Sequence, residues 1–527
     1  MSRRSAACAA RARHRGSPSR ATLLGLGVVA LTLIACADRS STPGGPSLAG
    51  EIDERFLSVA VDIDQLAGGT FWDPAGGPTV VDVPPYDFGR VRLRNLAAAL
   101  APAYLRLGGS ASDRTFYDLS DAPVSSPPPP FELVLTRAQL DAARAFAQDL
   151  GFDVVFTVAA GAGPRNGERR WTPGNARELL EYASAQGRPL AVLEFGNEPN
   201  LFAVRAGLSD YTAADFAGDL ETFLALRDEA APDTPVLAPG NIYTRTQGEE
   251  PVAGVVFGPR ATETIPLLGT LVDGLSYHYY AAVSTRCPLG PRITADTALD
   301  PAYLDGVDEP ADATESLREA HAPGKPIWVT ETGGQSCGGQ LGVADRFVNT
   351  FWYLDTLGRL ARRGHQVVVR QTLSGSTYGL IDELSLEPRP DYWAALLWRR
   401  LMGTRVLALP ELGASSPLRL FAHCTRGGGV GAVTLLALNT SGTAPVELPL
   451  ADLGLPLEGE LYVASAPTLD SPQIEVNGNA LIADVDGVPP AIAAARFAGP
   501  TLALAPATWT FAVFPDARAS ACLGGMK

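Results

Sequence analysis

Short apolar runs rich in β-branched and aromatic residues alternate with amphipathic segments between about residue 51 and about residue 403. The runs cover residues 56–62, 104–108, 153–159, 191–195, 235–239, 275–280, 326–330 and 366–373. Helical spacing of apolar residues predicts helices at residues 137–150, 175–186, 213–230, 344–363 and 391–402. Alternating strands and helices indicate βα units around a parallel sheet. Eight units predict an α/β fold, a closed (β/α)₈ TIM barrel over residues 51–403.

After Gly403 the helical period disappears. Runs at residues 418–423, 431–438 and 508–514 are punctuated by Gly, Pro, Ser and Asn, which is typical of strands joined by turns. Residues 404–527 are therefore expected to form an all-β sandwich domain. The chain has 527 residues, more than one hydrophobic core usually serves, so two folded units fit its length.

The N-terminus has the pattern of an export signal. Six arginines precede an apolar run at residues 21–35 that is too short to span a bilayer. The run ends in Leu33-Ile34-Ala35-Cys36, which resembles a bacterial lipoprotein box with Cys36 as the lipidated residue. An ordinary signal peptide with a chance cysteine is the alternative. We expect residues 1–36 to be a leader, residues 37–50 a Ser, Pro and Gly-rich linker, and the protein a cell-envelope lipoprotein or secreted.

Charge limits the possible partners. The net charge is −15, and removal of the leader takes away six arginines and no acidic residue, which leaves −21. Such a chain lacks the clustered cations that nucleic acid requires, and it repels polyanions except where a local arginine patch outweighs the field. We expect a monomer that touches a membrane only through its lipid anchor.

The cysteines suit two disulfides. Without Cys8 in the leader and Cys36 at the lipid site, four cysteines remain, and an exported protein can oxidise them. Pairing within each predicted domain gives Cys287–Cys337 and Cys424–Cys522. Free buried thiols are the alternative.

Two glutamates stand where the βα loops of a barrel converge. Glu198 follows the fourth run within Gly196-Asn197-Glu198-Pro199, and Glu331 ends the seventh run. A carboxyl pair about 5–5.5 Å apart cleaves glycosides with retention, one group protonating the leaving oxygen while the other attacks the anomeric carbon. A wider gap implies inversion. For one arbitrary glutamate, a helix N-cap or a salt bridge is the alternative.

The acid must hold its proton near neutral pH. We expect the negative charge of Glu331 to raise the pKa of Glu198 until a glycosyl bond neutralises it. The amide of Asn197 can bond a sugar hydroxyl, and Pro199 restricts the loop so that the carboxyl points inward.

The motifs around these residues resemble a known enzyme family. Gly-Asn-Glu-Pro after the fourth strand and a Glu ending the seventh are marks of a large clan of retaining glycosidases with this barrel. The segments that are similar, in order, to glycoside hydrolase family 79, the family of heparanase, are residues 56–62, 102–109, 194–200, 277–280, 369–371, 390–393, 423–425 and 521–522. The resemblance covers nearly the whole mature chain.

The resemblance implies a barrel with a β-sandwich and retaining cleavage of β-linked glucuronic acid, with no metal or organic cofactor. It implies that Glu198 is the acid/base, that Glu331 is the nucleophile and that Cys424–Cys522 ties the sandwich together. The substrate-lining positions it implies are Asp62, Ser110, Asn197, Tyr280, Gln371 and Tyr378. Each also has a structural alternative: the tyrosines can pack in the barrel, Gln371 can satisfy backbone groups and Asp62 can cap a strand end.

The loop after Glu331 offers a place for the sugar carboxylate. Gly338 and Gly339 have no side chains, so their backbone N–H groups can approach a ligand closely, and they resemble the family's Gly-Gly carboxylate loop. Ser336-Cys337 stands where heparanase carries a tyrosine ahead of the glycines. A Cys287–Cys337 bridge would hold the loop instead.

Two further features bear on the substrate. His278 is expected to orient the site rather than bind a metal, because no second ligand stands at metal-binding spacing along the sequence. Residues 243–250 contain one Arg and two Glu where heparanase carries basic clusters, so highly sulfated chains are not expected to bind.

These observations predict a heparanase-like endo-β-glucuronidase acting on glycosaminoglycan-like glycans. An exo-β-glucuronidase on smaller glycans would use the same residues. An arabinofuranosidase of the same clan would keep both glutamates but lack the carboxylate loop. A surface lipoprotein that binds carbohydrate without turnover is the non-enzymatic alternative, and the presence of both glutamates argues against it.

Overall fold

The computed structural model describes residues 45–523, apart from residues 168, 245–247, 250–257, 411 and 414–415. The predicted leader, with the lipidation at Cys36, lies outside the described residues. In the described part of the chain, no helix has the length and apolar character that crossing a membrane requires.

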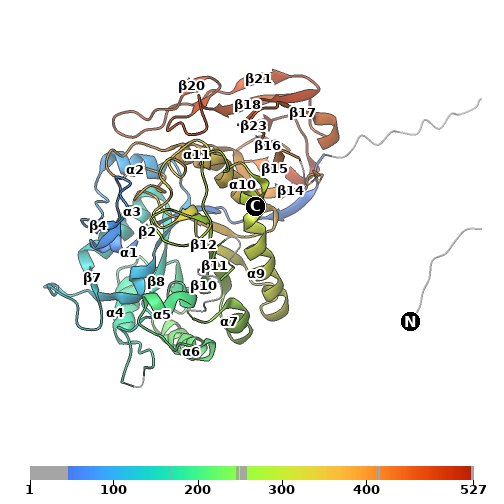
Figure 1. Ribbon diagram of the computed structural model, residues 1–527. Coiled ribbons are helices and arrows are strands. Elements are labelled where there is room, and N and C mark those ends of the chain that lie inside the picture. The colour runs from blue at the N-terminus through green and yellow to red at the C-terminus, as the bar shows by residue number, and fades with distance from the viewer. Residues whose placement is uncertain are drawn as a thin grey trace, which may run out of the picture. The chain divides into compact units, whose positions relative to one another are not determined.

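Eight parallel strands close into a barrel, as the apolar runs predict (Figure 1). The strands are β2 (Leu57–Asp62), β5 (Ala103–Gly108), β8 (Phe152–Val158), β9 (Val192–Phe195), β10 (Val236–Thr244), β11 (Gly274–Val283), β12 (Ile327–Ser336) and β13 (Val367–Arg370). Neighbours in the barrel follow chain order, and β13 pairs with β2 to close the ring. Each predicted run overlaps one of these strands.

Helices follow the strands and surround the barrel (Figure 1). The longer ones are α2 (Val91–Ala98), α3 (Arg137–Leu150), α4 (Gly174–Ala185), α6 (Ala213–Ala230), α7 (Ala261–Leu268), α9 (Asp308–His321), α10 (Asn349–Arg362) and α11 (Pro390–Leu401). The shorter ones are α1 (Ile63–Ala67), α5 (Phe202–Arg205) and α8 (Pro301–Leu304). In α3, Thr136 and Gln139 form a reciprocal capping box, and Gly151 ends the helix with a left-handed φ of 77°.

One helix starts later than its period predicts. Apolar spacing favours a helix from residue 344, but α10 begins at Asn349. The backbone N–H groups of Phe347 and Val348 donate to the carbonyls of Ser471 and Leu469 in the C-terminal region. This tertiary pairing replaces the first helical turn.

The C-terminal region is all-β, as predicted, and its sheets are antiparallel. Its main sheet contains β1 (Leu48–Glu51), β14 (Met402–Leu407), β15 (Leu418–Thr425), β16 (Val433–Asn439), β23 (Thr508–Phe514), β18 (Glu458–Ser465), β19 (Glu475–Val476), β20 (Asn479–Ala480) and β21 (Ala495–Ala498). A second sheet pairs β17 (Val446–Pro449) with β22 (Thr501–Leu504). Leu435 and Phe514 of the first sheet share an apolar core with Leu448 and Leu504 of the second, which makes a sandwich.

The edge strand of the main sheet is formed by the chain segment that precedes the first barrel strand. Strand β1 pairs with β14, with Leu48 opposite Leu407 and Glu51 opposite Arg405. The sequence predicts a tether as far as residue 50, and the strand corrects this boundary. Without β1, the outer edge of β14 would expose unpaired backbone groups.

Helices α10 and α11 lie between the barrel and the sandwich (Figure 1). Trp352 of α10 and Trp393 of α11 belong to the same buried cluster as Phe421 and Trp509 of the sandwich. The indole N–H of Trp509 also donates to the hydroxyl of Thr350 at 2.8 Å. One continuous core therefore supports both parts.

Candidate active site

A cavity of about 520 Å³ opens at the carboxyl ends of the barrel strands. The hairpin of β3 (Thr70–Trp72) and β4 (Val80–Asp82) contributes to its wall. The sequence-predicted residues that line the cavity are Asp62, Ser110, Glu198, Tyr280, Glu331, Gln371 and Tyr378. The other predicted residues, Asn197, His278, Gly338 and Gly339, do not line the cavity. His278 contacts Glu198, and the carbonyl of Gly338 accepts the backbone N–H of Tyr378, so these two support lining residues.

Glu198 lies on a strained turn after β9. Gly196 and Glu198 adopt left-handed φ angles of 74° and 55°, and Pro199 begins the 3₁₀ turn η2 (Pro199–Leu201). A left-handed φ is costly for a residue with a side chain and persists only where the surroundings impose it. The turn directs a buried carboxyl, 2% exposed, toward the cavity.

A second carboxyl group imposes this conformation. Asp113, in the 3₁₀ turn η1 (Ser110–Arg114), accepts the backbone N–H of Asn197 at 3.1 Å and that of Ala160 at 3.1 Å. Burial raises the pKa of Asp113 to about 7, against the opposing effect of these hydrogen bonds. Sequence analysis missed Asp113, because nothing along the chain indicates its contact with residue 197.

Glu331 lies inside β12, which continues to Ser336, rather than at a strand end as the sequence predicts. The hydroxyl of Tyr280 on β11 donates to one carboxylate oxygen at 2.7 Å. The guanidinium of Arg106 on β5 donates to the other at 2.8 Å. Both oxygens are therefore held in fixed directions, which suits a nucleophile.

Folding brings the two glutamates and His278 together. One carboxylate oxygen of each glutamate and a ring nitrogen of His278 lie within 4.8 Å of one another. Along the sequence His278 has no second ligand at metal-binding spacing, but the fold brings two carboxylates to it. Its Nδ1 lies 3.1 Å from Glu198 Oε1 and 3.9 Å from Glu331 Oε2. Arg106 already places a cation here, 3.3 Å from His278 Nε2. We therefore interpret the group as an acid–base centre rather than a metal site.

Arg106 organises this centre and was missed from the sequence. It is 1% exposed and also donates to Glu194 at 2.6 Å and to Asn197 at 2.9 Å. Charge and hydrogen bonds from Arg106 help to lower the pKa of Glu194 against the opposing effect of burial. An arginine in the middle of an apolar strand was the available signal, because a buried charge requires partners.

The electrostatics of Glu198 differ from the prediction. Burial raises the pKa of its carboxyl, but the hydrogen bond with His278 and the charges of Arg205 and Arg106 outweigh burial and lower the pKa. The sequence predicts a raised pKa from the charge of Glu331. That prediction is wrong for this arrangement, because Arg106 pairs with Glu331 and adds an opposing charge of its own.

The glycine loop is tightly packed. Cys337, Gly338 and Gly339 all have left-handed φ angles, of 58°, 77° and 82°. A side chain on Gly338 would meet Arg286, and one on Gly339 would meet Tyr378. The glycines thus make room for neighbouring side chains, and they bring the loop against Tyr378.

Asp62, Gln371 and Tyr378 form a polar group on the cavity wall. The Gln371 amide donates to Asp62 Oδ2 at 3.3 Å and to the Tyr378 hydroxyl at 3.5 Å. Asp62, the last residue of β2, also caps α1 by accepting the N–H of Asp64. It therefore has a structural role as a cap and also lines the cavity. Burial, with the charges of Asp64 and Glu331, raises the pKa of Asp62 well above its usual range.

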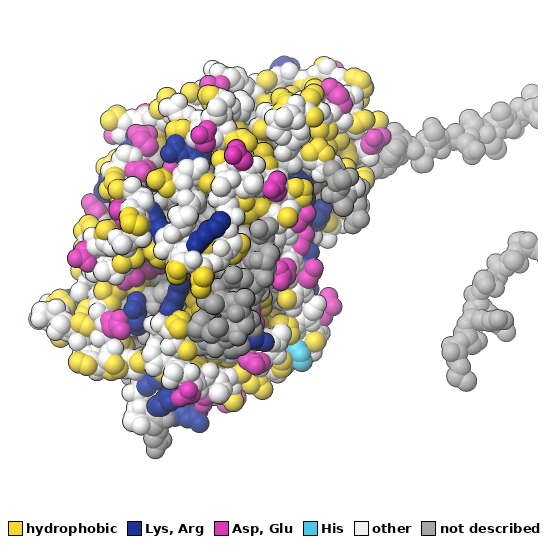
Figure 2. Space-filling view, viewed as in Figure 1, with side chains coloured by type: hydrophobic (Ala, Val, Ile, Leu, Met, Phe, Trp, Pro, Cys, Tyr) yellow, Lys and Arg dark blue, Asp and Glu magenta, His cyan; other side chains and the backbone are white. Residues whose placement is uncertain are grey.

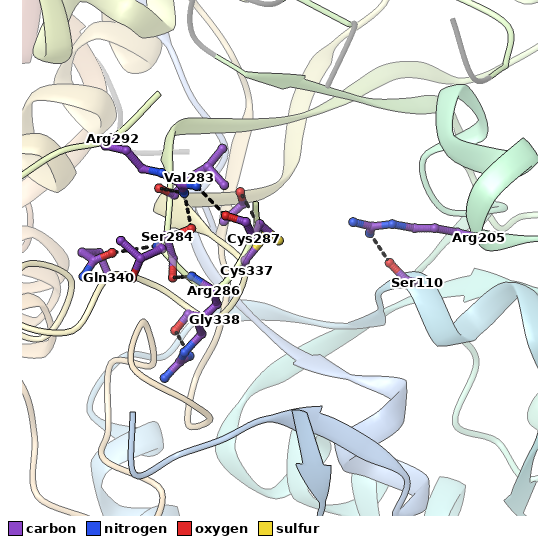
Figure 3. The surroundings of a disulfide bond; sticks show 12 residues. Ser110, Arg205, Val283, Ser284, Arg286, Cys287, Arg292, Cys337, Gly338 and Gln340 are labelled. Atoms are coloured by element: carbon purple, nitrogen blue, oxygen red, sulfur yellow. Dashed lines mark hydrogen bonds between the residues drawn. A yellow bond between two sulfur atoms is a disulfide. The ribbon is translucent and has the colours of Figure 1, made fainter. Parts of the chain in front are cut away.

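Both cysteine pairings are present as disulfides. Cys287 and Cys337 join the chain after β11 to the chain after β12, and both line the cavity. Figure 3 shows this disulfide beside Arg286, with Arg205 and Ser110 on a separate part of the surroundings. Arg286 donates a hydrogen bond to the carbonyl of Gly338 at 3.2 Å, so the disulfide and Arg286 together hold the glycine loop.

The acidic stretch at residues 243–250 is only partly described. Glu249 is not among the residues that line the cavity, and it accepts the backbone N–H of Ala261 at the start of α7 at 2.7 Å. Burial raises its pKa to about 7. Glu249 therefore stabilises a helix N-terminus.

Residues 83–358, more than half of the chain, match the profile described as glycosyl hydrolase family 79, N-terminal domain. The chain belongs to glycosyl hydrolase family 79. Among its relatives, heparanase-like protein 1 of Arabidopsis thaliana is 30% identical over 422 residues, which cover 74% of this chain and 71% of the relative. Heparanase of Gallus gallus is 28% identical over 491 residues, 82% of this chain and 89% of the relative. Baicalin-β-D-glucuronidase of Scutellaria baicalensis is 28% identical over 443 residues, covering 76% and 78%.

Solved structures of other glycosidases share the fold of this chain. A 4-O-α-L-rhamnosyl-β-D-glucuronidase from Fusarium oxysporum superposes with a TM-score of 0.64 at 13% identity, covering 89% of this chain and 99% of that one. A family 51 α-L-arabinofuranosidase from Bifidobacterium longum reaches 0.62 at 14% identity, covering 89% and 97%. Both chemistries occur on this fold, so the fold alone does not select between them.

Proposed function

We propose that the protein is a retaining β-glucuronidase with Glu198 as general acid/base and Glu331 as nucleophile. The observation that carries the mechanism is that one oxygen of Glu198 and one oxygen of Glu331 lie within 4.8 Å of each other. Retaining glycosidases hold their carboxyl groups about 5–5.5 Å apart, and inverting ones about 6.5–9.5 Å to admit a water. Family membership and the names of its relatives support glucuronides as substrates.

In the first step, a carboxylate oxygen of Glu331 attacks the anomeric carbon, and the bond to the leaving oxygen breaks as that oxygen takes the proton of Glu198. Tyr280 and Arg106 keep the nucleophile aligned. In the second step, Glu198 accepts a proton from water while the water oxygen displaces Glu331. The sugar leaves with its β configuration retained.

The sugar carboxylate is proposed to lie at the part of the cavity wall formed by Cys337 and Tyr378, which the loop of Gly338 and Gly339 supports from behind. Loop and tyrosine are in contact, and Tyr378 lines the cavity. Asp62 and Gln371, which lie on the same wall, are placed to bond sugar hydroxyls. An arabinofuranoside has no carboxylate for this loop, which favours a glucuronide.

We propose cleavage within glycosaminoglycan-like chains of low sulfation, with removal of terminal glucuronic acid as the second candidate. Heparanases among the relatives support the first, and the baicalin-β-D-glucuronidase supports the second. On the face shown in Figure 2, basic side chains occur singly or in small groups among acidic ones. Such a surface favours weakly charged chains over heavily sulfated ones.

The test is to incubate the purified protein with heparan sulfate and with its unsulfated precursor polymer and to measure product sizes. Mid-sized oligosaccharides that depend on Glu331 would establish internal cleavage, and free glucuronic acid alone would establish the second candidate. Glu331→Gln should reduce the rate by about a thousandfold or more. If neither polymer gives a product whose formation depends on Glu331, the proposed function is wrong.

Stereochemistry tests the mechanism separately. Proton NMR of the first product released from an aryl β-glucuronide should show the β anomer before mutarotation. The α anomer would mean inversion, and it would contradict the roles given to both glutamates.

A further inference from the structure

Arg205 ends helix α5 and contacts the acid/base residue. Its Nη1 donates to Glu198 Oε2 at 3.1 Å and to the hydroxyl of Ser110 at 2.6 Å, the second contact drawn in Figure 3. The side chain of Arg205 is 46% exposed, whereas that of Glu198 is 2% exposed. One end of this ion pair is therefore buried, while the other is open to solvent at the cavity wall.

Several charged or titratable groups face Glu198. The cations are Arg106 on β5 and Arg205 on α5, with His278 on β11 as a titratable neighbour; the acidic or hydroxyl groups are Asp113 in η1, Glu331 on β12 and Tyr280 on β11. Arg106 is buried and bound to Glu194 and Glu331, and His278 is buried. Arg205 is the exposed member of this group, so it is the one that a ligand can draw away.

The ion pair opposes the first chemical step. A general acid must carry a proton when it meets the leaving oxygen, and a neighbouring guanidinium favours the ionised form. Glu198 donates to the leaving oxygen, so the leaving group lies beside its carboxyl and within reach of Arg205. A guanidinium also matches the geometry of carboxylate and sulfate groups.

We propose that Arg205 binds an anionic group, a carboxylate or a sulfate, on the leaving-group side of the scissile bond, and that this exchange releases Glu198 to be protonated. The inference rests on the proposed glucuronidase function. It makes Arg205 a specificity-determining residue that couples recognition of the leaving group to the protonation of the acid.

The experiment compares three aryl β-glucuronides, whose leaving phenols carry a sulfonate, a carboxylate or a neutral sulfonamide. The ratio of kcat/KM between an anionic substrate and the neutral one is measured for the parent enzyme and for Arg205→Gln. Dividing the two ratios cancels the intrinsic reactivity of each phenol. The quotient should be roughly two- to fivefold in favour of the anion, the range for a half-exposed ion pair.

A pH profile separates this role from a merely structural one. Removing the charge of Arg205 raises the pKa of Glu198, so the acid form persists further, and the alkaline limb of kcat/KM for the neutral substrate should move to higher pH. Arg205→Lys keeps the charge and should leave this limb in place. A merely structural defect would lower kcat/KM without shifting the alkaline limb of the pH profile.

Arg114→Gln is the matched control. Arg114 lines the same cavity but pairs with Glu132 at 2.9 Å, so its loss removes one positive charge without removing a partner of Glu198. Its quotient should stay near one. A quotient near one for Arg205→Gln, or an equal effect from Arg114→Gln, would overturn the inference while leaving glucuronide hydrolysis intact. No hydrolysis of any of the three substrates would overturn the inference, and the polymer assay would then decide whether the proposed function falls with it.

Discussion

Asp113 controls the active centre without facing the cavity. Its carboxylate accepts two backbone N–H groups, one of them from the residue before Glu198, and so holds the left-handed turn that presents Glu198. Its pKa of about 7 lies above the ordinary value of 3.8 because burial disfavours the charge. The position of Glu198 thus depends on a residue that lies 84 positions before Asn197 in the chain.

Replacing Asp113 with Asn tests this role. One amide face cannot accept an N–H, so we expect kcat to fall about tenfold and the free energy of unfolding to fall by about 1–3 kcal/mol. Because the folded pKa is raised, the folded protein binds this proton more tightly, and the contribution of Asp113 to stability declines as pH rises from about 4 to about 7. Denaturant unfolding across this range should show a flatter slope in Asp113→Asn. An unchanged slope together with an unchanged kcat would contradict the assignment.

At the scale of elements, β11 and β12 carry the most chemistry and are joined at their ends. Tyr280 and His278 lie on the first strand and Glu331 on the second, and Cys287–Cys337 links the segments that follow them. The bridge closes a separation of 50 residues next to the glycine loop. It therefore stabilises the protein and positions the loop.

The two disulfides make a matched pair of variants. Replacing Cys287 and Cys337 with Ser should raise KM for a glucuronide more than it lowers kcat, because the glycine loop loses its support, and should lower stability by about 2–4 kcal/mol. Replacing Cys424 and Cys522, which lie in the sandwich with a separation of 98 residues, should lower stability with KM unchanged. Steady-state kinetics and thermal unfolding of both variants provide the measurement. If the variant without Cys287–Cys337 has the same KM as the variant without Cys424–Cys522, the first bridge has no positioning role.

At the scale of the whole molecule, the barrel and the sandwich share a core. Helices α10 and α11 contribute Trp352 and Trp393 to the cluster that contains Trp509, and β1 crosses from the barrel side to complete the main sheet. Part of the apolar surface of each is buried only against the other. The two should therefore unfold as one cooperative unit.

Calorimetry should show one unfolding transition for the parent protein. Trp509→Ala removes a fully buried indole and its hydrogen bond to Thr350, so it should cost about 3–5 kcal/mol and lower the single midpoint. If two transitions appear, and the variant shifts only the one belonging to the sandwich, the shared core does not couple the two parts.

Sequence patterns alone determined the eight βα units, the all-β character of the C-terminal region and the placement of Glu198 after the fourth strand. They put Glu331 at the end of the seventh strand, whereas it lies inside that strand. These features follow from local periodicity and from the geometry of a closed barrel, where strand ends converge on one rim. The tertiary structure decided what surrounds the glutamates. Arg106 meets Glu331 across 225 residues of sequence, and Arg205 reaches Glu198 from the end of a short helix that no period predicts. Because electrostatic effects on a pKa depend on distance through space and on burial, the lowered pKa of Glu198 could not be read from the order of residues along the chain.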